Sequence, residues 1–301
     1  MNKLKSAISN CFAMKGLGEV SECLGMRVTR DRINGITKLD QEHYARDVIE
    51  RFGMSDCRTR ITPMDVSQKL SKPSTENGSD LFQKIMGALM YLAVCTRADI
   101  SHAVGFLSQF NNCNGQEHLN AARRVIAYLK GTVSYGLCFK KGDGVLTGLA
   151  DADYANCLDD RASFTGYVFK LNNGVISWRS AKQRTLTLPD STTYAEYVAL
   201  SECGKEGIFL LGLLNKLGFS QKTAVIFNDN QGAIKISNGA TSAVSTSMYV
   251  KYHQLKRWVS KGVFDIKYRY LSSDKMLADV FTKALDGTKH RYCIQGIGIV
   301  G

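Results

Sequence analysis

From residue 144 onward, the hydrophobic pattern consists of short apolar runs separated by turns and by longer helical stretches. Strands are predicted near 145–151, 164–170, 174–179, 223–229 and 264–271, and helices near 191–217, 230–238, 248–261 and 274–285. The first three strands follow one another through short turns, which predicts an antiparallel meander. The fourth is reached through a long helix and can lie parallel to the first. The pattern therefore predicts an α/β fold with a mixed five-stranded sheet flanked by helices.

The preceding residues predict a small α+β unit. Residues 24–39 read as two strands around Asn34-Gly35, a hairpin signal because both turn positions favour positive φ. A helix capped by Asp40 is predicted to follow. Residues 63–80 contain two of the three prolines and few large apolar side chains, which is typical of a linker.

Two helical stretches, near 80–110 and 116–131, follow the linker. These features divide the chain into three predicted regions: 1–62, 63–143 and 144–290.

The charge balance favours a polyanionic partner. The chain carries 39 Lys and Arg against 27 Asp and Glu, a formal net charge of +12. The stretch at 116–131 places Arg123, Arg124 and Lys130 beside an apolar face. Such a helix could lie along a phosphate backbone or be a packing helix with a solvated basic face, and the sequence leaves both readings open.

The cysteines and the apolar runs predict an intracellular protein, cytoplasmic or nuclear and not secreted. The nine cysteines are scattered singly, as is typical of reduced thiols. The longest apolar stretch, at 87–95, falls well short of the ~20 residues that span a bilayer. The N-terminus lacks the apolar core of a signal peptide. No membrane partner is expected.

Four acidic residues occupy positions where elements of the predicted sheet converge. Asp151 closes the first strand (GLADADYANCLDD), and Asp229 ends the fourth (AVIFNDNQG). Glu196 lies in the first turns of the long helix, and Asp279 lies in the last predicted helix. Each acid alone is typical of a solvated surface, but strand ends and helix starts meet at one edge of such a sheet. Clustered carboxylates repel one another and would have strongly raised pKa values unless a cation neutralised them, and oxygen ligands select Mg²⁺ or Mn²⁺.

Several stretches resemble a known family. ADADYANCLDDRASFTGYVF, VISWRSAKQ, STTYAEYVALSE, NDNQGAI and LADVFTKAL are similar to the ribonuclease H domain of copia/Ty1-type retrotransposon Pol polyproteins, over 145–286. FAMKGLGEVSECLGMRVTRDR, RFGMSDCRTRITPMD and IMGALMYLAVCTRADISHAV resemble the end of the reverse transcriptase and the connecting region of the same polyproteins. The resemblance implies a ribonuclease H-like sheet, preceded by a small reverse-transcriptase remnant and a helical connection.

The resemblance also implies an activity. The family's metal-binding acids fall on Asp151, Glu196, Asp229 and Asp279, which would hold two Mg²⁺ or Mn²⁺ ions and cleave the RNA strand of an RNA–DNA hybrid. The polymerase active site is expected to be absent, because the only look-alike of its Tyr-x-Asp-Asp turn is Cys157-Leu158-Asp159-Asp160, where the family has no polymerase role. Other parts of the polyprotein are further candidate partners. Two alternatives stay open: a remnant that binds nucleic acid without cutting it, and a relic without a cellular role.

Some positions depart from the family pattern. The long helix carries Gly204, Gly207 and Gly212 where the family favours Ala or a long side chain, and we interpret these glycines as decay of the helix. His253 is the only histidine between Asp229 and Asp279, but a lone histidine in a helical stretch favours a packing or surface role over proton transfer.

Overall fold

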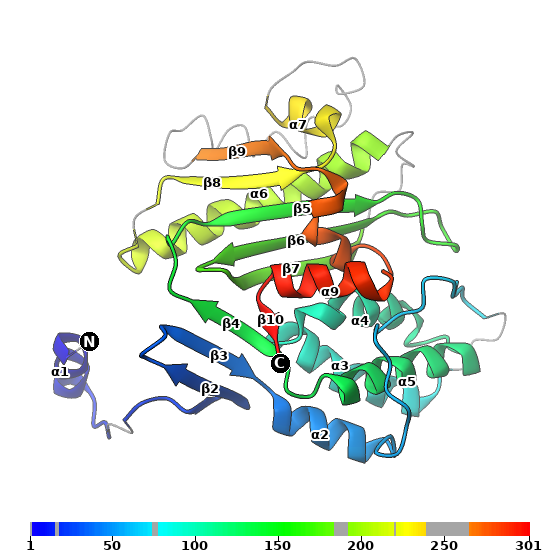
Figure 1. Ribbon diagram of the computed structural model, residues 1–301, viewed down its shortest axis with the longest axis horizontal. Coiled ribbons are helices and arrows are strands. Elements are labelled where there is room, and N and C mark those ends of the chain that lie inside the picture. The colour runs from blue at the N-terminus through cyan, green and yellow to red at the C-terminus, as the bar shows by residue number, and fades with distance from the viewer. Residues whose placement is uncertain (1, 16–17, 74–77, 184–191, 220, 239–264) are drawn as a thin grey trace.

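The computed structural model describes residues 2–15, 18–73, 78–183, 192–219, 221–238 and 265–301, which form two five-stranded sheets and a group of helices (Figure 1). The predicted helix at 248–261, with His253, lies outside the described residues. None of the described helices combines the length and the apolar character needed to cross a lipid bilayer.

The larger sheet has the predicted mixed topology, in the order β7-β6-β5-β8-β9. Its strands are β5 (Thr147–Asp153), β6 (Phe164–Leu171), β7 (Gly174–Lys182), β8 (Thr223–Asn228) and β9 (Asp265–Tyr270). Strands β5, β6 and β7 are antiparallel, whereas β8 lies parallel to β5 and β9 parallel to β8. The prediction of a ribonuclease H-like mixed sheet is therefore confirmed, with each strand within three residues of its expected bounds.

Helices cover both faces of this sheet. The long helix α6 (Thr192–Lys216) lies behind it in Figure 1 and packs on Ala150, Phe169 and Ile226. On the front face, Leu149, Val168 and Val175 pack against the C-terminal segment. Helix α7 (Gln231–Ser237) follows β8, with Asn230 as its cap. The alternation along β5 explains the two cores, since neighbouring residues of a strand point to opposite faces.

The surroundings of Gly207 favour a packing role over helix decay, and the interpretation stays a prediction to be tested. Gly207 is buried where α6 meets the sheet, and a Cβ atom there would lie 3.1 Å from Phe169 and 3.2 Å from Ile266. The absence of a side chain thus lets the helix approach the strands. Gly204 is also buried, and Gly212 is half-buried.

The C-terminal segment is not the single helix predicted at 274–285. It forms two 3-10 helices, η4 (Ser273–Lys275) and η5 (Leu277–Phe281), separated by the extended residue Met276. Met276, Ala278, Val280 and Phe281 are all buried. An α-helix would turn some of these side chains to solvent, so the demand for burial against the sheet prevails over helical periodicity.

Helix α9 and strand β10 were not predicted. Helix α9 (Gly287–Gly296) begins after Asp286, whose carboxylate accepts hydrogen bonds from the backbone N–H groups of Thr288 and Lys289 at 2.8 and 3.0 Å. Strand β10 (Ile299–Val300) then joins the smaller sheet.

The smaller sheet draws its strands from distant parts of the chain, in the order β1-β2-β3-β4-β10. It comprises β1 (Glu22–Cys23), β2 (Met26–Asp31), β3 (Ile36–Asp40), β4 (Gly136–Lys140) and β10. The predicted hairpin of β2 and β3 is present, but a four-residue loop replaces the expected two-residue turn. In this loop Gly35 alone has positive φ, and Asp31 accepts a hydrogen bond from the Asn34 N–H at 3.0 Å. The division of the chain into three regions stays a prediction.

A group of helices with a core of its own lies next to the smaller sheet (Figure 1). Its helices are α2 (Glu42–Arg51), α3 (Asp80–Cys95), α4 (Ser101–Leu107) and α5 (Gln116–Gly131), with the 3-10 turns η1 (Ala98–Ile100) and η2 (Ser108–Phe110). A further helix, α1 (Asn2–Cys11), precedes the smaller sheet in the sequence. Asp40 is the last residue of β3, not the cap of α2, although its carboxylate accepts a 3.2 Å hydrogen bond from the Glu42 N–H.

The basic face of α5 is largely committed to contacts within the chain. Arg124 pairs with Asp65 at 3.1 Å, and Lys130 donates to the Cys57 carbonyl at 2.7 Å. Arg123 is exposed. These contacts favour the packing role for α5 over contact with a phosphate backbone.

Candidate active site

Three carboxylates meet at the carboxyl ends of the two central parallel strands. Ligand oxygens of Asp151, Glu196 and Asp229 lie within 4.8 Å of one another. Asp151 is near the end of β5, Asp229 follows the last residue of β8, and Glu196 comes from the second turn of α6. Parallel neighbouring strands bring their carboxyl ends to one edge of the sheet, which is why residues so far apart in sequence come together here.

Asn228 holds Glu196 in place. Its side-chain amide donates hydrogen bonds to the Ala150 carbonyl at 2.9 Å and to Glu196 Oε2 at 2.8 Å. Asn228 is fully buried, so both bonds are shielded from water. One side chain thus links the two central strands to α6. On the outer side of the cluster, Asp229 accepts a 2.7 Å hydrogen bond from Ser273.

Burial and mutual repulsion oppose ionisation of this cluster. Burial, together with the nearby acids Asp279 and Asp229, raises the pKa of Asp151 to about 7, although Lys283 and Thr282 act in the opposite direction. Burial and the adjacent Asp151 raise the pKa of Glu196 to about 9. A cation bound among the carboxylates would remove this penalty. The donor set consists of carboxylate oxygens, which suits a hard ion such as Mg²⁺ or Mn²⁺.

The fourth predicted acid, Asp279, lies beside the cluster and is paired with lysines. Asp279 belongs to η5, and its carboxylate contacts Lys283 Nζ at 2.7 Å and Lys289 Nζ at 3.1 Å. Lys283 Nζ also lies 3.6 Å from Asp151 Oδ2. Lys283 therefore bridges Asp279 and Asp151. Asp279 does not belong to the close group of three carboxylates, which consists of Asp151, Glu196 and Asp229.

A glycine permits this arrangement. Gly166 pairs with Asp151 across β5 and β6, and a Cβ atom there would lie 2.7 Å from both Phe281 and Thr282. The end of η5 therefore lies directly on the sheet. Because of this approach, the Thr282 hydroxyl donates a hydrogen bond to the Asp151 carboxylate.

Asp153 and the polymerase look-alike take other roles. Asp153 accepts a hydrogen bond from Asn156 and is not among the three converging acids, which supports the choice of Asp151. In the look-alike, Asp159 accepts a hydrogen bond from the Lys72 N–H at 3.0 Å, and Asp160 pairs with Lys182 at 2.7 Å.

Sequence reasoning missed the residues that surround the acids. They are Asn228, Ser273, Thr282, Lys283 and Lys289. Asn228 directly precedes Asp229, and Lys283 follows Asp279 by four residues, so each stood within a motif that had been singled out. Their polar contacts depend on the packing of η5 and α6 on the sheet, which sequence spacing does not show.

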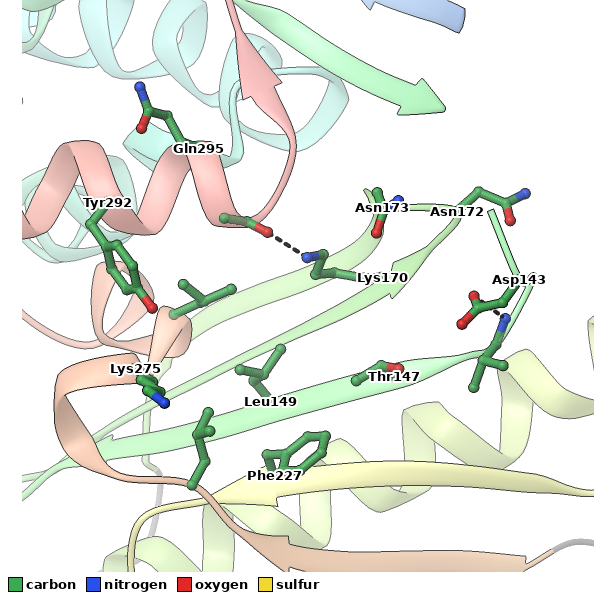
Figure 2. A pocket seen from close by; sticks show the side chains of 14 residues that line it. Asp143, Thr147, Leu149, Lys170, Asn172, Asn173, Phe227, Lys275, Tyr292 and Gln295 are labelled. Atoms are coloured by element: carbon green, nitrogen blue, oxygen red, sulfur yellow. Dashed lines mark hydrogen bonds between the residues drawn. The ribbon is translucent and has the colours of Figure 1, made fainter. Parts of the chain in front are cut away.

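A cavity of about 700 Å³ lies on the front face of the larger sheet and is distinct from the acid cluster (Figure 2). Leu149 and Phe227 contribute apolar surface from the strands, and Tyr292 borders it from α9. Lys170 also lines the cavity, but its ammonium group donates to the Gly296 carbonyl. None of the four predicted acids lines this space.

The chain is similar to retrotransposon polyproteins over nearly its whole length. Residues 1–66 match a family described as reverse transcriptase (RNA-dependent DNA polymerase). The chain is 39% identical to the Retrovirus-related Pol polyprotein from transposon TNT 1-94 of Nicotiana tabacum, and 34% identical to that from transposon RE1 of Arabidopsis thaliana. These matches cover 99% and 97% of this chain but 23% and 20% of the relatives, so the chain spans about a fifth of their length.

Among solved structures, the chain is similar to LC11-RNase H1, described in complex with an RNA/DNA hybrid. The match covers 46% of this chain and 93% of that protein, with 14% identity and a TM-score of 0.36.

Proposed function

The chain belongs to the Pol polyprotein family of Ty1/copia-type retrotransposons, and from that premise we propose that it is a metal-dependent endonuclease that cleaves the RNA strand of RNA–DNA hybrids. The observation that carries the proposal is the convergence of Asp151, Glu196 and Asp229 within 4.8 Å at the ends of β5 and β8. Oxygen ligands so close together, on a sheet of ribonuclease H-like topology, fit a site for hard divalent ions.

Each protein group has a definite task in this proposal. Asp151, Glu196 and Asp229 would hold a divalent ion, and Asp151 with Asp279 would hold a second. When bound, such a pair of ions lowers the pKa of water and stabilises charge on the leaving oxygen in an in-line displacement. Asn228 orients Glu196, and Thr282 orients Asp151. Hydrolysis would add water across the phosphodiester and leave a 3′-hydroxyl and a 5′-phosphate.

The substrate proposal depends on charge and on backbone chemistry. The net charge of +12 favours a nucleic acid, and the 2′-hydroxyl distinguishes RNA from DNA. Between residues 250 and 291 there are ten Lys and Arg against four Asp and Glu, and we propose that this segment contributes phosphate contacts. We also propose an intracellular setting, where such hybrids form.

The experiment is cleavage of an end-labelled RNA–DNA hybrid with Mg²⁺, with Mn²⁺ and with a chelator. Asp151→Asn should reduce cleavage by more than about 100-fold, because loss of even an outer-shell partner of a metal ligand costs about 10–100-fold. Asp47→Asn, an exposed change on α2, should leave cleavage unaltered. Hybrid binding without ion-dependent cleavage would contradict the proposal and favour a non-catalytic binding remnant.

A further inference from the structure

The acidic site consists of two halves that differ in charge balance. On one side, Asp151 and Asp279 lie among two ammonium groups, those of Lys283 and Lys289. On the other side, Glu196 and Asp229 accept hydrogen bonds from the neutral groups of Asn228 and Ser273. Within the described ranges, no basic side chain forms an ion pair with Glu196 or Asp229. A first divalent ion is therefore expected at Asp151, Glu196 and Asp229, because Glu196 and Asp229 have no basic partner that the ion must displace.

Lys283 occupies the gap between the other two acids. Its ammonium group lies 2.7 Å from Asp279 Oδ1 and 3.6 Å from Asp151 Oδ2. The backbone on either side is fixed, because Thr282 bonds to Asp151 and the N–H groups of Thr282 and Lys283 both donate to the Asp279 carbonyl at 3.2 Å. The lysine therefore places a positive charge between the two carboxylates that would share a second ion.

We propose that Lys283 and a second divalent ion compete for the same position between Asp151 and Asp279. The inference rests on the proposed function, since it assumes that these acids hold metal. An ammonium group and a divalent ion cannot both lie between these two carboxylates. Their repulsion at a few ångströms is strong, and both need the same carboxylate oxygens. The second ion thus binds only when the lysine side chain moves away.

The exposure of Lys283 makes such a displacement feasible. Its side chain is 38% exposed, and it stands on a flexible four-carbon stem. Asp151 and Asp279 are buried, so breaking their contacts with Lys283 costs free energy that is subtracted from the binding of the second ion. The expected consequence is a large difference in affinity between the two ions, with the second binding at a higher concentration.

Lys289 provides a matched comparison. It contacts Asp279 at 3.1 Å and also donates to the carbonyls of Ser273 and Asp274, both at 2.8 Å. No ion pair joins it to Asp151 among the contacts of the described residues. Removing Lys289 takes one positive charge from Asp279 but leaves Lys283 between Asp151 and Asp279. A comparison of the two variants therefore distinguishes the effect of lost positive charge from the effect of an emptied position.

The test is calorimetric titration of the free protein with Mn²⁺, without nucleic acid, for wild type, Lys283→Met and Lys289→Met. Wild type should bind one ion tightly, and Lys283→Met should bind the second ion at least about tenfold more tightly than wild type, a change of about 1.4 kcal/mol. Lys289→Met should show a smaller gain. An unchanged second site in Lys283→Met would overturn the inference, as would an equal gain in both variants.

Two further measurements separate this inference from the proposed function. Lys283→Gln, which keeps a polar end but lacks the charge, should reproduce the gain if Lys283→Met folds poorly, as judged by circular dichroism. Failure of both variants to strengthen the second site, with hybrid cleavage intact in wild type, would overturn the inference and leave the proposed function standing. Strengthened binding without any cleavage would support the competition and contradict the nuclease.

Discussion

Asn228 Nδ2 donates a 2.8 Å hydrogen bond to Glu196 Oε2, and this buried contact joins the central strand β8 to α6 at the acid cluster. The same amide donates to the Ala150 carbonyl on the neighbouring strand β5. The position of Glu196 therefore depends on a neutral side chain, and not on an opposing charge.

Asn228→Ala should destabilise the fold. The substitution removes one hydrogen bond from a buried carbonyl and one from a buried carboxyl group, and each loss costs about 1–3 kcal/mol. We expect the free energy of unfolding in urea to fall by roughly 2–6 kcal/mol. Asn238→Ala, at the exposed end of α7, should change it by less than about 0.5 kcal/mol. Equal losses in the two variants would show that the buried amide has no special role.

Gly207→Ala should also destabilise the protein. The added methyl would lie 3.1–3.2 Å from the side chains of Phe169 and Ile266, which are packed in the core and must be displaced, at a cost of about 1–3 kcal/mol. Gly87→Ala is the matched control, because Gly87 is an exposed position inside α3 with no atom within 4 Å of the added Cβ. It should stabilise by about 0.4–1 kcal/mol. Thermal melts should therefore shift in opposite directions; an upward shift for Gly207→Ala would restore the interpretation of a decayed helix.

Local patterns explain why the larger sheet could be predicted. The short apolar run at 145–150 (VLTGLA) and the β-branched residues of 223–227 (TAVIF) favour strands, and the long helix between them allows a parallel pair. The pairing in turn places Asp151 and Asp229 at one edge, so most of the site could be predicted from strand ends. Asp279 was selected by resemblance as much as by position. The single helix predicted to carry it is replaced by the 3-10 helices η4 and η5.

The remaining features depend on contacts between residues distant in sequence. Strand β10 has only two residues, and its pairing with β4 joins positions about 160 residues apart. The bend at Met276 reflects burial against the sheet, which overrides a helical pattern in the sequence. The close packing of η5 on Gly166 likewise could not be predicted from the presence of a glycine, since glycine is equally typical of a turn.

His102 should make stability fall in mild acid. Burial lowers the pKa of His102 to about 4 from an unfolded value of about 6.5. Between these values the unfolded chain binds a proton that the folded chain does not, so stability decreases as pH falls from about 6.5 to 4, by about 3 kcal/mol in total. Above pH 6.5 the effect is absent, because the imidazole is neutral in both states.

The variant His102→Gln isolates this contribution. The change removes the titrating group, so the variant should lose about 3 kcal/mol less than wild type between pH 7.5 and pH 4. Urea unfolding at the two pH values measures the difference. The acids of the site titrate in both proteins and cancel in the comparison. Parallel pH profiles would show that His102 does not carry the effect.

Arg97→Met should be among the most destabilising single changes. Arg97 and Asp99 are almost completely buried and pair at 2.8 Å, and Arg97 also donates to the Thr132 carbonyl at 2.9 Å. The substitution leaves Asp99 with the Tyr128 hydroxyl, at 2.8 Å, as its remaining side-chain donor. Stranding a buried carboxylate in this way costs about 3–5 kcal/mol. Urea unfolding should show a loss of that size.

The double variant Arg97→Met, Asp99→Leu distinguishes an unpaired charge from lost packing. Replacing both partners removes the buried charges together, and such replacements are often neutral or stabilising, so the double variant should recover most of the loss. Arg32→Ala serves as the surface control, because its pair with Glu19 has both side chains more than two-thirds exposed. That change should cost less than about 1 kcal/mol. A double variant no more stable than Arg97→Met would mean that the shape of the arginine, and not its charge, supports the group of helices.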